Sequence, residues 1–250
     1  MQAAMHRLVG KKAFVTGGSR GIGAGIVCRL AREDAAVAFT YRGRRDAAER
    51  VEQEIKKSGG QAIAIQADSG DPDALTKAAD HVAEELEGID IFVSSAGTLL
   101  FKPIEQFTLE DFNHIVAVDL RAAYVGSKTV LKHMGKGGRI VFISSNIADH
   151  AALPMTSLYS MAKAGLDGLC KGMARDLGPK EITVNTVHPG PISTDANPED
   201  GPYSKQLKSF MASPKFGKAE DVAGLVAYLV SDEAAFASGA SYRIDNAFAA

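Results

Sequence analysis

The sequence has few of the features that mark secreted, membrane or disulfide-bonded proteins. Only two cysteines occur in 250 residues, Cys28 and Cys170. They lie far apart on predicted helices and match no metal or redox spacing, so we interpret them as buried thiols in a reducing compartment. No apolar run approaches the roughly 20 residues that cross a bilayer, and residues 1–12 lack an apolar signal core. We therefore expect a cytoplasmic protein without membrane contact.

An excess of charge of either sign is also absent. The chain has 28 basic and 30 acidic residues, a net charge of -2, and no long block of like charge. This argues against a nucleic-acid-binding surface. Internal repeats and low-complexity tracts are missing as well. What is present is ample apolar material for a core, at 46% of residues, in a length that suits an α/β domain.

Short β-branched runs alternate with longer helical patterns along the whole chain. Strands are predicted at residues 12–16, 37–41, 62–66, 89–94, 139–144, 183–188 and 241–244. Helices are predicted at residues 22–32, 46–58, 72–86, 109–134 (continuous or broken), 159–177, 203–212 and 220–229. Apolar strands separated by helices predict a doubly wound parallel sheet covered on both faces, as one domain over residues 1–250. Such folds bind ligands at the carboxyl ends of their strands.

The first strand leads into a glycine-rich turn, Thr16-Gly17-Gly18-Ser19-Arg20-Gly21-Ile22-Gly23. A helix starts there, so its free N–H groups and the positive end of its dipole face outward and predict a seat for phosphate. Gly17 allows a tight turn, Gly21 lets an anion approach the backbone, and Gly23 lets the helix lie close to the strand. By itself, the pattern is equally compatible with a turn that binds no ligand.

The end of the second strand indicates which dinucleotide the turn would bind. Sites for NAD usually place Asp or Glu there, but residues 39–45 contain no carboxylate. Arg42, with Arg20 from the glycine turn, can form paired, charge-assisted bonds to a 2′-phosphate, which predicts NADPH. Arg44 and Arg45 are interpreted as solvated residues at a helix start.

Three further residues carry the chemistry of carbonyl reduction. Tyr159 and Lys163 lie one helical turn apart on the same face. An ammonium beside a phenol lowers a pKa that starts near ~10, which would help Tyr159 to exchange a proton while nicotinamide delivers a hydride. Ser145 follows the strand at residues 139–144 and can bond the substrate oxygen. A Tyr/Lys pair alone is usually ordinary helix surface, whereas the combination is far more specific.

With these motifs in this order, the chain resembles the classical short-chain dehydrogenase/reductase family over essentially its whole length. The matching elements are Thr16 to Gly23, Asp68, Ser94-Ser95-Ala96-Gly97, Ser145, Tyr159-x-x-x-Lys163 and Pro189-Gly190-x-x-x-Thr194. The resemblance implies a seven-stranded Rossmann fold with Tyr159 as proton donor, Lys163 as its pKa modulator and Ser145 as the ligand of the substrate oxygen. It also implies a homotetramer or homodimer built from the helices at residues 109–134 and 159–177.

The same resemblance implies an NADPH site, in which Lys163 holds the nicotinamide ribose, Thr194 contacts the carboxamide and Asp68 accepts from adenine. Asp68 is equally well interpreted as a turn residue. No metal site is expected. The cofactor-binding residues it implies are Gly17, Ser19, Arg20, Gly21, Ile22, Gly23, Tyr41, Arg42, Asp68, Ser69, Ala96, Gly97, Tyr159, Lys163, Pro189, Gly190, Ile192 and Thr194.

Two positions depart from the family pattern. Asp119 replaces an asparagine that normally holds a water in the proton relay behind the lysine. Asp119 can pair with Lys163 and accept from that water but cannot donate, so we predict slowed or pH-shifted turnover and count it with the catalytic residues. The interval from Ser145 to Tyr159 is one residue longer than in many members. This leaves Asn146 at the commoner serine position, and Ser145 remains the better candidate because the longer interval also occurs in the family.

The identity of the ketone or alcohol substrate stays open between 3-oxoacyl thioesters and free aromatic or cyclic ketones. The stretch 195–214 is either a lid or an ordinary surface loop. His150 and His188 are interpreted as a polar loop residue and a strand-end residue. Residues that could form an apolar wall of the site, or simply core, are Leu99, Leu100, Phe101, Ile147, Leu153 and Met155.

A different class of function is compatible with the same sequence. Residues 189–198 and the C-terminal tail resemble bacterial cyclic-di-GMP-binding biofilm-dispersal members of the family. That resemblance implies a nucleotide-binding regulator in which binding, not turnover, is the role. The complete Ser145, Tyr159 and Lys163 set favours the enzyme, and the changed residue at Asp119 gives the regulator some weight.

Overall fold

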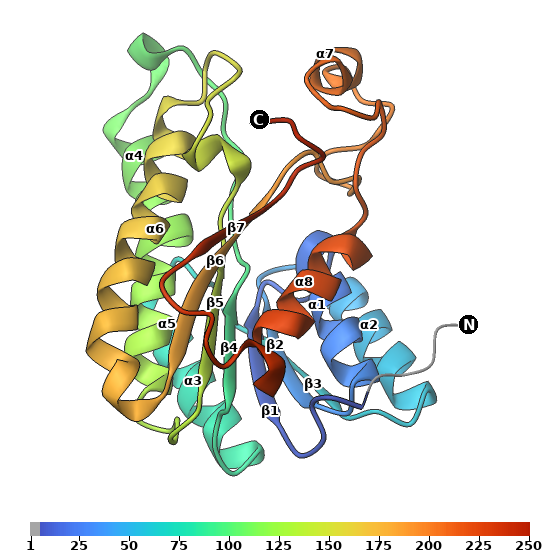
Figure 1. Ribbon diagram of the computed structural model, residues 1–250, viewed down its shortest axis with the longest axis vertical. Helices are drawn as coiled ribbons and strands as arrows, with labels where there is room; N and C mark the ends of the chain where they lie inside the picture. Colours follow the sequence, from blue (N-terminus) through green and yellow to red (C-terminus); the bar gives the residue numbers. More distant parts are fainter. Residues whose placement is uncertain (1–5) are drawn as a thin grey trace.

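The computed structural model describes residues 6–250, in which seven strands form one parallel sheet with helices on both faces (Figure 1). The sheet order is β3-β2-β1-β4-β5-β6-β7, which confirms the predicted doubly wound fold. The strands are β1 (Lys12–Thr16), β2 (Ala36–Tyr41), β3 (Ala62–Gln66), β4 (Ile91–Ser94), β5 (Arg139–Ile143), β6 (Thr183–Pro189) and β7 (Ser241–Ile244).

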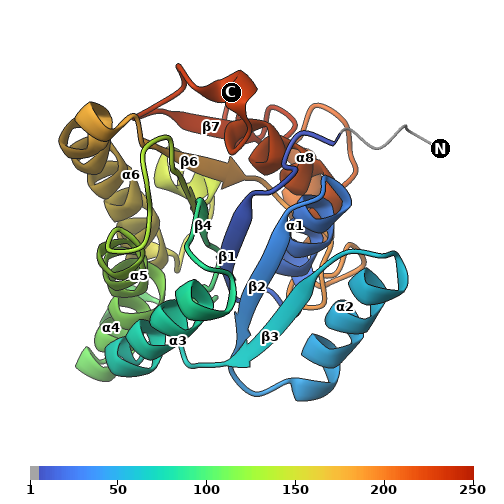
Figure 2. The ribbon, with the colours of Figure 1, turned by 90° about the horizontal axis from the view of Figure 1, so that it is seen from below.

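The helices form two layers, one on each face of the sheet (Figure 2). One layer contains α1 (Gly21–Arg32), α2 (Arg45–Lys57) and α8 (Ala219–Leu229). The other contains α3 (Pro72–Glu85), α4 (Leu109–Ile115), α5 (Ala122–Val130) and α6 (Ser157–Leu177). The short helix α7 (Ser204–Ser209) stands away from both layers, beyond the carboxyl ends of the strands (Figure 1).

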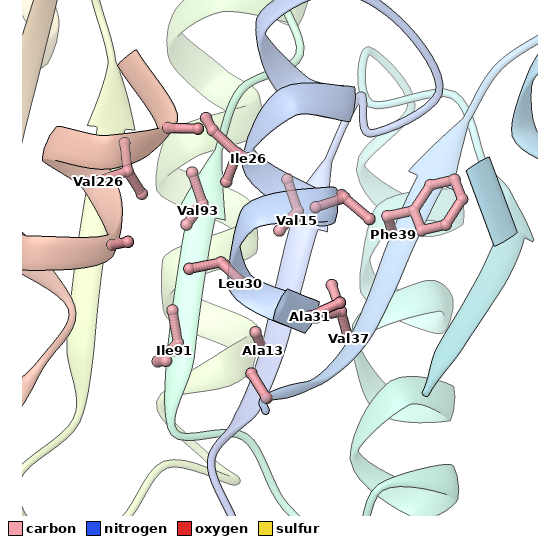
Figure 3. Close-up of a cluster of buried hydrophobic side chains, with 14 of the residues drawn as sticks. Ala13, Val15, Ile26, Leu30, Ala31, Val37, Phe39, Ile91, Val93 and Val226 are labelled. Carbon is pink, nitrogen blue, oxygen red and sulfur yellow. The ribbon is translucent and has the colours of Figure 1, made fainter. Parts of the chain in front are cut away.

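Two apolar cores hold the layers to the sheet, because successive strand residues point to opposite faces. On one face, Val15, Phe39 and Val93 pack with Ile26 and Leu30 of α1 (Figure 3). On the other face, the neighbouring strand residues Phe14, Phe92 and Phe142 pack against helices α3, α5 and α6. Both faces of the central strands are therefore covered, and the strand ends form a rigid base for a site.

The helix predicted at residues 109–134, either continuous or broken, is broken in the structure. Helix α4 ends at Ile115, a π-helical turn runs over Val116–Arg121, and α5 follows from Ala122. A π-turn places one extra residue in the helical circuit and is frequent at functional sites. Asp119 lies within it and is buried. Another predicted helix, at residues 203–212, is shorter and forms only α7 over Ser204–Ser209.

The order of strands reverses between β1 and β4, and this junction is bound together by specific contacts. The Thr16 hydroxyl accepts hydrogen bonds from the backbone N–H groups of Ser95 and Ala96, at 3.1 and 3.2 Å. Gly17 has a φ of +69°, and a Cβ there would lie 2.9 Å from the Ala96 Cα. The turn after β1 and the end of β4 therefore lie in direct contact, at the crevice where doubly wound folds bind ligands.

The chain-wide expectations can be compared with residues 6–250 only. None of the helices in that range combines the length and the apolar character needed to cross a membrane. Residues 1–5, part of the stretch expected to lack a signal core, lie outside the described residues. Cys170 is buried and Cys28 is half-buried, and both are free. Burial raises the pKa of the Cys170 thiol to about 12, so it is uncharged at neutral pH.

Candidate active site

The predicted catalytic residues Ser145 and Tyr159 face one cavity at the carboxyl edge of the sheet, and Lys163 lies behind Tyr159. The cavity has a volume of about 560 Å³, and both Ser145 and Tyr159 line it. Ser145 comes directly after the Ser144 that follows β5, whereas Tyr159 lies in the first turn of α6. The Lys163 Nζ lies 5.6 Å from the centre of the Tyr159 ring. The segment after β5 and helix α6 thus bring a hydroxyl, a phenol and an ammonium together.

Behind the tyrosine, Lys163 is held by a buried ion pair. Its Nζ lies 3.1 Å from Asp119 Oδ1 and donates a hydrogen bond to the Ile143 carbonyl at 3.1 Å. The Asp119 side chain is fully buried and also accepts from the backbone N–H of Thr98, at 3.1 Å. The predicted pairing of Asp119 with Lys163 is therefore present. It fixes the ammonium between β5 and the π-helical turn.

The pKa of Tyr159 shifts in the direction opposite to the prediction from sequence. Burial raises the pKa of Tyr159 and the Asp119 carboxylate adds to the rise, while Lys163 and the Ser145 hydroxyl lower it without cancelling the increase. Burial disfavours the charged form of Lys163, but Asp119 and Tyr159 outweigh it, so the pKa of Lys163 is raised. Tyr159 is consequently a protonated phenol at neutral pH, which is the form that can donate a proton.

The glycine turn presents an open helix terminus toward this cavity. Arg20 is the N-cap residue of α1, no side chain caps the helix, and its first turn contains no acidic residue. Gly21 has a φ of +54° and faces the Thr194 methyl group, while a Cβ on Gly23 would lie 2.2 Å from the Gly17 carbonyl oxygen. The terminus therefore keeps backbone N–H donors and a positive dipole for an anion, and the residues present fit a dinucleotide phosphate.

Of the three arginines that follow β2, two form ion pairs and one does not, among the described residues. Arg44 pairs with Asp46 at 3.2 Å and Arg45 pairs with Glu49 at 2.8 Å, both on the exposed start of α2. These pairs agree with the solvated role predicted for them. Arg42 is exposed, and within residues 6–250 its guanidinium forms no ion pair. Its position beside the last residue of β2 leaves it available to a phosphate.

The other predicted cation of the 2′-phosphate site, Arg20, pairs with a residue of the proposed lid. Its guanidinium lies 3.1 Å from Asp195 Oδ2, and both side chains are more than half exposed. An exposed pair of this kind contributes little to stability and is easily exchanged. Arg20 can therefore leave Asp195 for a doubly charged phosphate at small cost.

The residues predicted for the adenine end lie at the ends of β2 and β3. Tyr41 is the last residue of β2 and is buried, and Ser69 is buried in the turn after β3. Asp68 is exposed and accepts a hydrogen bond from the backbone N–H of Gly70 at 2.8 Å. One Asp68 oxygen therefore braces a turn, which is the role left open beside adenine binding, while the other faces no partner among the described residues.

The predicted residues around the nicotinamide lie with the catalytic residues. The cavity wall includes Ile22, Pro189, Gly190, Ile192 and Thr194, beside Ser145 and Tyr159. Gly97 completes the group from β4, since a Cβ there would lie 3.0 Å from Asp119 Oδ1 and 3.3 Å from Lys163 Nζ. The ends of β1, β4, β5 and β6 thus contribute to one site, as the parallel sheet predicts.

The outer wall of the cavity is apolar and partly aromatic. Five of the six residues predicted for it are present, and Leu100 is the exception. The Phe101 ring packs edge-on against Tyr159, with centroids 6.1 Å apart. Stretch 195–214 contributes Pro198, Tyr203 and Leu207, and the C-terminal tail contributes Phe248. The residues that line this cavity include no lysine, arginine, aspartate or glutamate.

Several residues with a place at the site had no such role in the sequence prediction, and His150, interpreted as a polar loop residue, lines the cavity. Thr98 holds Asp119 through its backbone, and Phe248 closes the cavity from the tail. His188, interpreted as an ordinary strand-end residue, is fully buried between the carboxylates of Asp149 and Asp167. A signal existed for Asp167, which follows Lys163 by one helical turn and so continues the Tyr159 face of α6.

Comparison with known proteins gives matches over nearly the whole chain. A family model described as enoyl-(acyl carrier protein) reductase matches residues 17–248. The chain is 40% identical over 246 residues to a cyclic-di-GMP-binding biofilm dispersal mediator protein from Escherichia coli K12, covering 98% of this chain and 100% of that protein. It is 38% identical over 253 residues to versicolorin reductase stcU from Emericella nidulans, covering 96% of each.

Among solved structures, the chain matches a short chain dehydrogenase from Burkholderia cenocepacia J2315 in complex with NADP. The TM-score is 0.96 at 46% sequence identity, and the match covers 98% of this chain and 100% of that one. The cofactor in that complex, NADP, carries the 2′-phosphate that Arg20 and Arg42 of this chain are predicted to bind.

Proposed function

The chain belongs to the short-chain dehydrogenase/reductase family, and we propose that it is an NADPH-dependent reductase that converts a ketone into a secondary alcohol. The observation that carries the proposal is that Ser145 and Tyr159 line one cavity, with the Lys163 Nζ 5.6 Å from the centre of the Tyr159 ring. The open terminus of α1 at the same cavity supports binding of a dinucleotide. The Arg42 guanidinium, which forms no ion pair among the described residues, favours NADPH over NADH because it can bind the 2′-phosphate.

In the proposed reaction, each residue has a separate task. NADPH, held by the α1 terminus, Thr194 and Lys163, would supply the hydride. The Ser145 hydroxyl donates a hydrogen bond to the substrate oxygen, and Tyr159 delivers its proton to that oxygen as the negative charge develops. The raised pKa keeps Tyr159 protonated for this step. Lys163, held by Asp119, stabilises the phenolate that remains.

The cavity favours a free apolar ketone over a 3-oxoacyl group on a carrier. A carrier-bound thioester brings a phosphate and an acidic protein surface, which need cations around the entrance. The cavity wall has none, and two lysines next to lining residues are already paired. Lys102 lies 2.7 Å from Asp111, and Lys208 lies 2.9 Å from Glu199. The aromatic edge of Phe101 beside Tyr159 suits a flat, ring-containing ketone.

The direct test is oxidation of NADPH, followed by the nicotinamide absorbance, against a panel of ketones. The panel contains aromatic and cyclic ketones, acetoacetyl thioesters and a carrier-bound 3-oxoacyl group, with NADH in parallel. Turnover of a ring ketone with NADPH is the expected result. Turnover confined to the thioesters contradicts the substrate class, and NADPH binding without turnover of any member contradicts the enzyme.

Arg42→Ala should weaken use of NADPH about 10–100-fold in kcat/KM, because a charge-assisted bond is worth roughly 1.5–3 kcal/mol. Use of NADH, which has no 2′-phosphate, should change little. Arg45→Ala is the matched control, since Arg45 is equally exposed but pairs with Glu49. Steady-state kinetics with NADPH and NADH measures kcat/KM for each variant. An equal loss of kcat/KM with the two cofactors in Arg42→Ala would contradict a contact between Arg42 and the 2′-phosphate.

We also propose that stretch 195–214 acts as a lid. It lines the cavity through Tyr203 and Leu207, and its first residue, Asp195, pairs with Arg20 in the cofactor turn. The pair must open when Arg20 binds a phosphate, so cofactor binding and movement of the stretch are coupled through one residue. The small apolar cluster of Met211, Phe216 and Phe248 holds the far end of the stretch to the C-terminal tail.

A homotetramer or homodimer remains our proposal for the assembly. Four large apolar side chains are exposed on α4, α5 and α6, namely Leu109, Phe112, Tyr124 and Met161. Exposed apolar patches of this kind mark contact surfaces. We expect light scattering after size exclusion to give a dimeric or tetrameric mass. Leu109→Glu with Tyr124→Glu should lower that mass, and a monomeric wild-type protein would contradict the proposal.

A nucleotide-binding regulator is the second candidate function. It is supported by the 40% identity, over the full length of that protein, to the biofilm dispersal mediator, whose name describes it as cyclic-di-GMP-binding. The cavity wall, without cationic side chains, offers poor recognition of two phosphates. The enzyme is therefore the better supported candidate, and loss of turnover in a variant that still binds NADPH separates the two.

A further inference from the structure

A buried histidine connects three elements of the active site. His188, the residue before the last in β6, is fully buried, and each of its ring nitrogens faces a carboxylate. Nδ1 lies 3.1 Å from Asp149 Oδ2, and Nε2 lies 2.8 Å from Asp167 Oδ1. Ionised carboxylates only accept hydrogen bonds, so both contacts form only when both ring nitrogens carry protons. The arrangement therefore describes an imidazolium between two carboxylates.

The two carboxylates belong to the elements that carry the proposed catalytic groups. Asp149 ends the 3₁₀ turn that starts after Ser145, and its N–H donates to the Asn146 carbonyl at 3.1 Å. The next hydrogen bond of the turn runs from the Ala148 N–H to the Ser145 carbonyl, at 3.0 Å. Asp167 lies on α6, the helix of the proposed proton donor. His188 thus joins the Ser145 turn to α6 through β6.

Other polar groups from each neighbouring element surround this cluster. Asp167 also accepts from the Thr186 hydroxyl of β6 at 2.7 Å and from the Ser241 hydroxyl of β7 at 3.1 Å. From β7, Arg243 brings a cation within 3.9 Å of Asp149. From α6, Cys170 lies near Asp167 and is an uncharged thiol at neutral pH. Arg243 is half exposed, and its 3.9 Å distance to Asp149 is longer than the 3.1 Å distance from His188. His188 is therefore the principal partner of Asp149.

The charges keep the imidazole protonated beyond its ordinary range. Burial lowers the pKa of His188, but the hydrogen bonds and charges of Asp167 and Asp149 outweigh burial and raise it. A group whose pKa is raised on folding stabilises the fold in its protonated form. The contribution is fully present below the ordinary histidine pKa of about 6.5, and it is lost as the pH rises through the raised value.

A metal ion is the alternative occupant of the three side chains, whose ligand atoms lie within 4.8 Å of one another. One ion could bind only one of the two ring nitrogens, because they point to opposite sides of the ring. The other nitrogen would still face a carboxylate, and Asp167 Oδ1 already accepts from two hydroxyl donors besides His188. The hydrogen-bond geometry therefore favours an imidazolium clamp.

We propose that His188 is a positioning residue that holds Ser145 at the cavity through Asp149, and that its deprotonation loosens the Ser145 turn. The proposal rests on the proposed function, in which Ser145 binds the substrate oxygen. An error in the position of a catalytic group costs rate and not cofactor affinity. The Ser145 hydroxyl is suited to such control, because its own turn contact, the Ile147 N–H, is long at 3.3 Å.

The test uses Asp149→Asn, which keeps the size of a half-exposed side chain and removes one charge from the clamp. The control is Asp80→Asn, because Asp80 forms the exposed pair with His133 at 2.7 Å on the α3 side of the molecule. Histidine ring signals are titrated by NMR in the wild-type protein and both variants. The chain has six histidines. His188 is identified as the histidine whose signal responds to Asp149→Asn.

We expect a His188 pKa above about 6.5 in the wild-type protein and a lower one in Asp149→Asn. In that variant, kcat for the ketone should fall roughly tenfold with KM for NADPH unchanged, and the alkaline limb of kcat should move to lower pH. Asp80→Asn should change neither the His188 pKa nor the value and pH profile of kcat. A His188 pKa at or below its ordinary value overturns the clamp, and unchanged kcat in Asp149→Asn overturns the positioning role. If the wild-type protein reduces no ketone, the proposed function fails, and the NMR titration alone decides the clamp.

Discussion

Tyr159→Phe is expected to lose turnover by about 10²–10⁴-fold, the range that a general acid contributes. The variant removes one oxygen and leaves the ring that packs edge-on against Phe101, so the cavity keeps its shape. The phenol that would protonate the substrate oxygen is then missing from the cavity wall. NADPH binding, measured by the fluorescence of the bound nicotinamide, should change little, because the terminus of α1 and the side chains of Lys163 and Thr194 are unaltered.

The same variant separates the two candidate functions. A reductase loses its activity in Tyr159→Phe, whereas a regulator that acts by binding nucleotide keeps its biological effect. Tyr228→Phe, at a half-exposed position on α8 outside the cavity, is the matched control and should behave as the wild-type protein. Turnover by Tyr159→Phe at the rate of that control would show that the proton comes from elsewhere.

The sequence predicts the fold and the residues of the inner site because both depend on local patterns. Alternation of apolar strands and helices requires a parallel sheet, and a parallel sheet brings every strand end to one edge. Gly17, Ser145 and Thr194, each next to a different strand end, therefore come together without further information. The order of their motifs along the chain predicts that Ser145, Tyr159 and Thr194 lie together, and all three line the cavity.

What the sequence could not predict depends on contacts between distant residues. The pKa of Tyr159 is one case, because Lys163 is visible at a spacing of four residues, whereas the burial that raises this pKa arises only on folding. His188 is another, since its two carboxylate partners lie 39 and 21 residues away along the chain. Phe248 reaches the cavity from the C-terminal tail, where no pattern indicates a site.

The second large effect is expected at Asp119, where Asp119→Ala should lower the free energy of unfolding by about 3–5 kcal/mol. The substitution leaves the Lys163 ammonium buried without its counter-ion and takes the acceptor from the Thr98 N–H. Removing one partner of a buried pair costs far more than the pair contributes, because the remaining charge stays out of water. Denaturant titration at neutral pH measures the loss.

Asp119→Asn serves as the matched variant, since it keeps an oxygen for Thr98 and loses only the charge. Its loss of stability should be smaller than that of Asp119→Ala. The pKa of Lys163 is raised in the wild-type protein, so the contribution of the pair is fully present below the ordinary lysine value near ~10.4 and is lost as the pH rises through the raised one. Equal denaturation midpoints for the wild-type protein and Asp119→Ala would contradict a stabilising role for this carboxylate.

The charge of Asp119 should also set the direction in which the site works best. Asp119 raises the pKa of Tyr159, and a phenol with a high pKa is protonated and ready to reduce a ketone at neutral pH. Oxidation of the alcohol needs the phenolate as base, so in the wild-type protein it should increase toward alkaline pH. In Asp119→Asn the pKa of Tyr159 falls, and the oxidation profile should move toward lower pH. An identical pH–rate profile in the two proteins would mean that Asp119 holds Lys163 in place without tuning the proton donor.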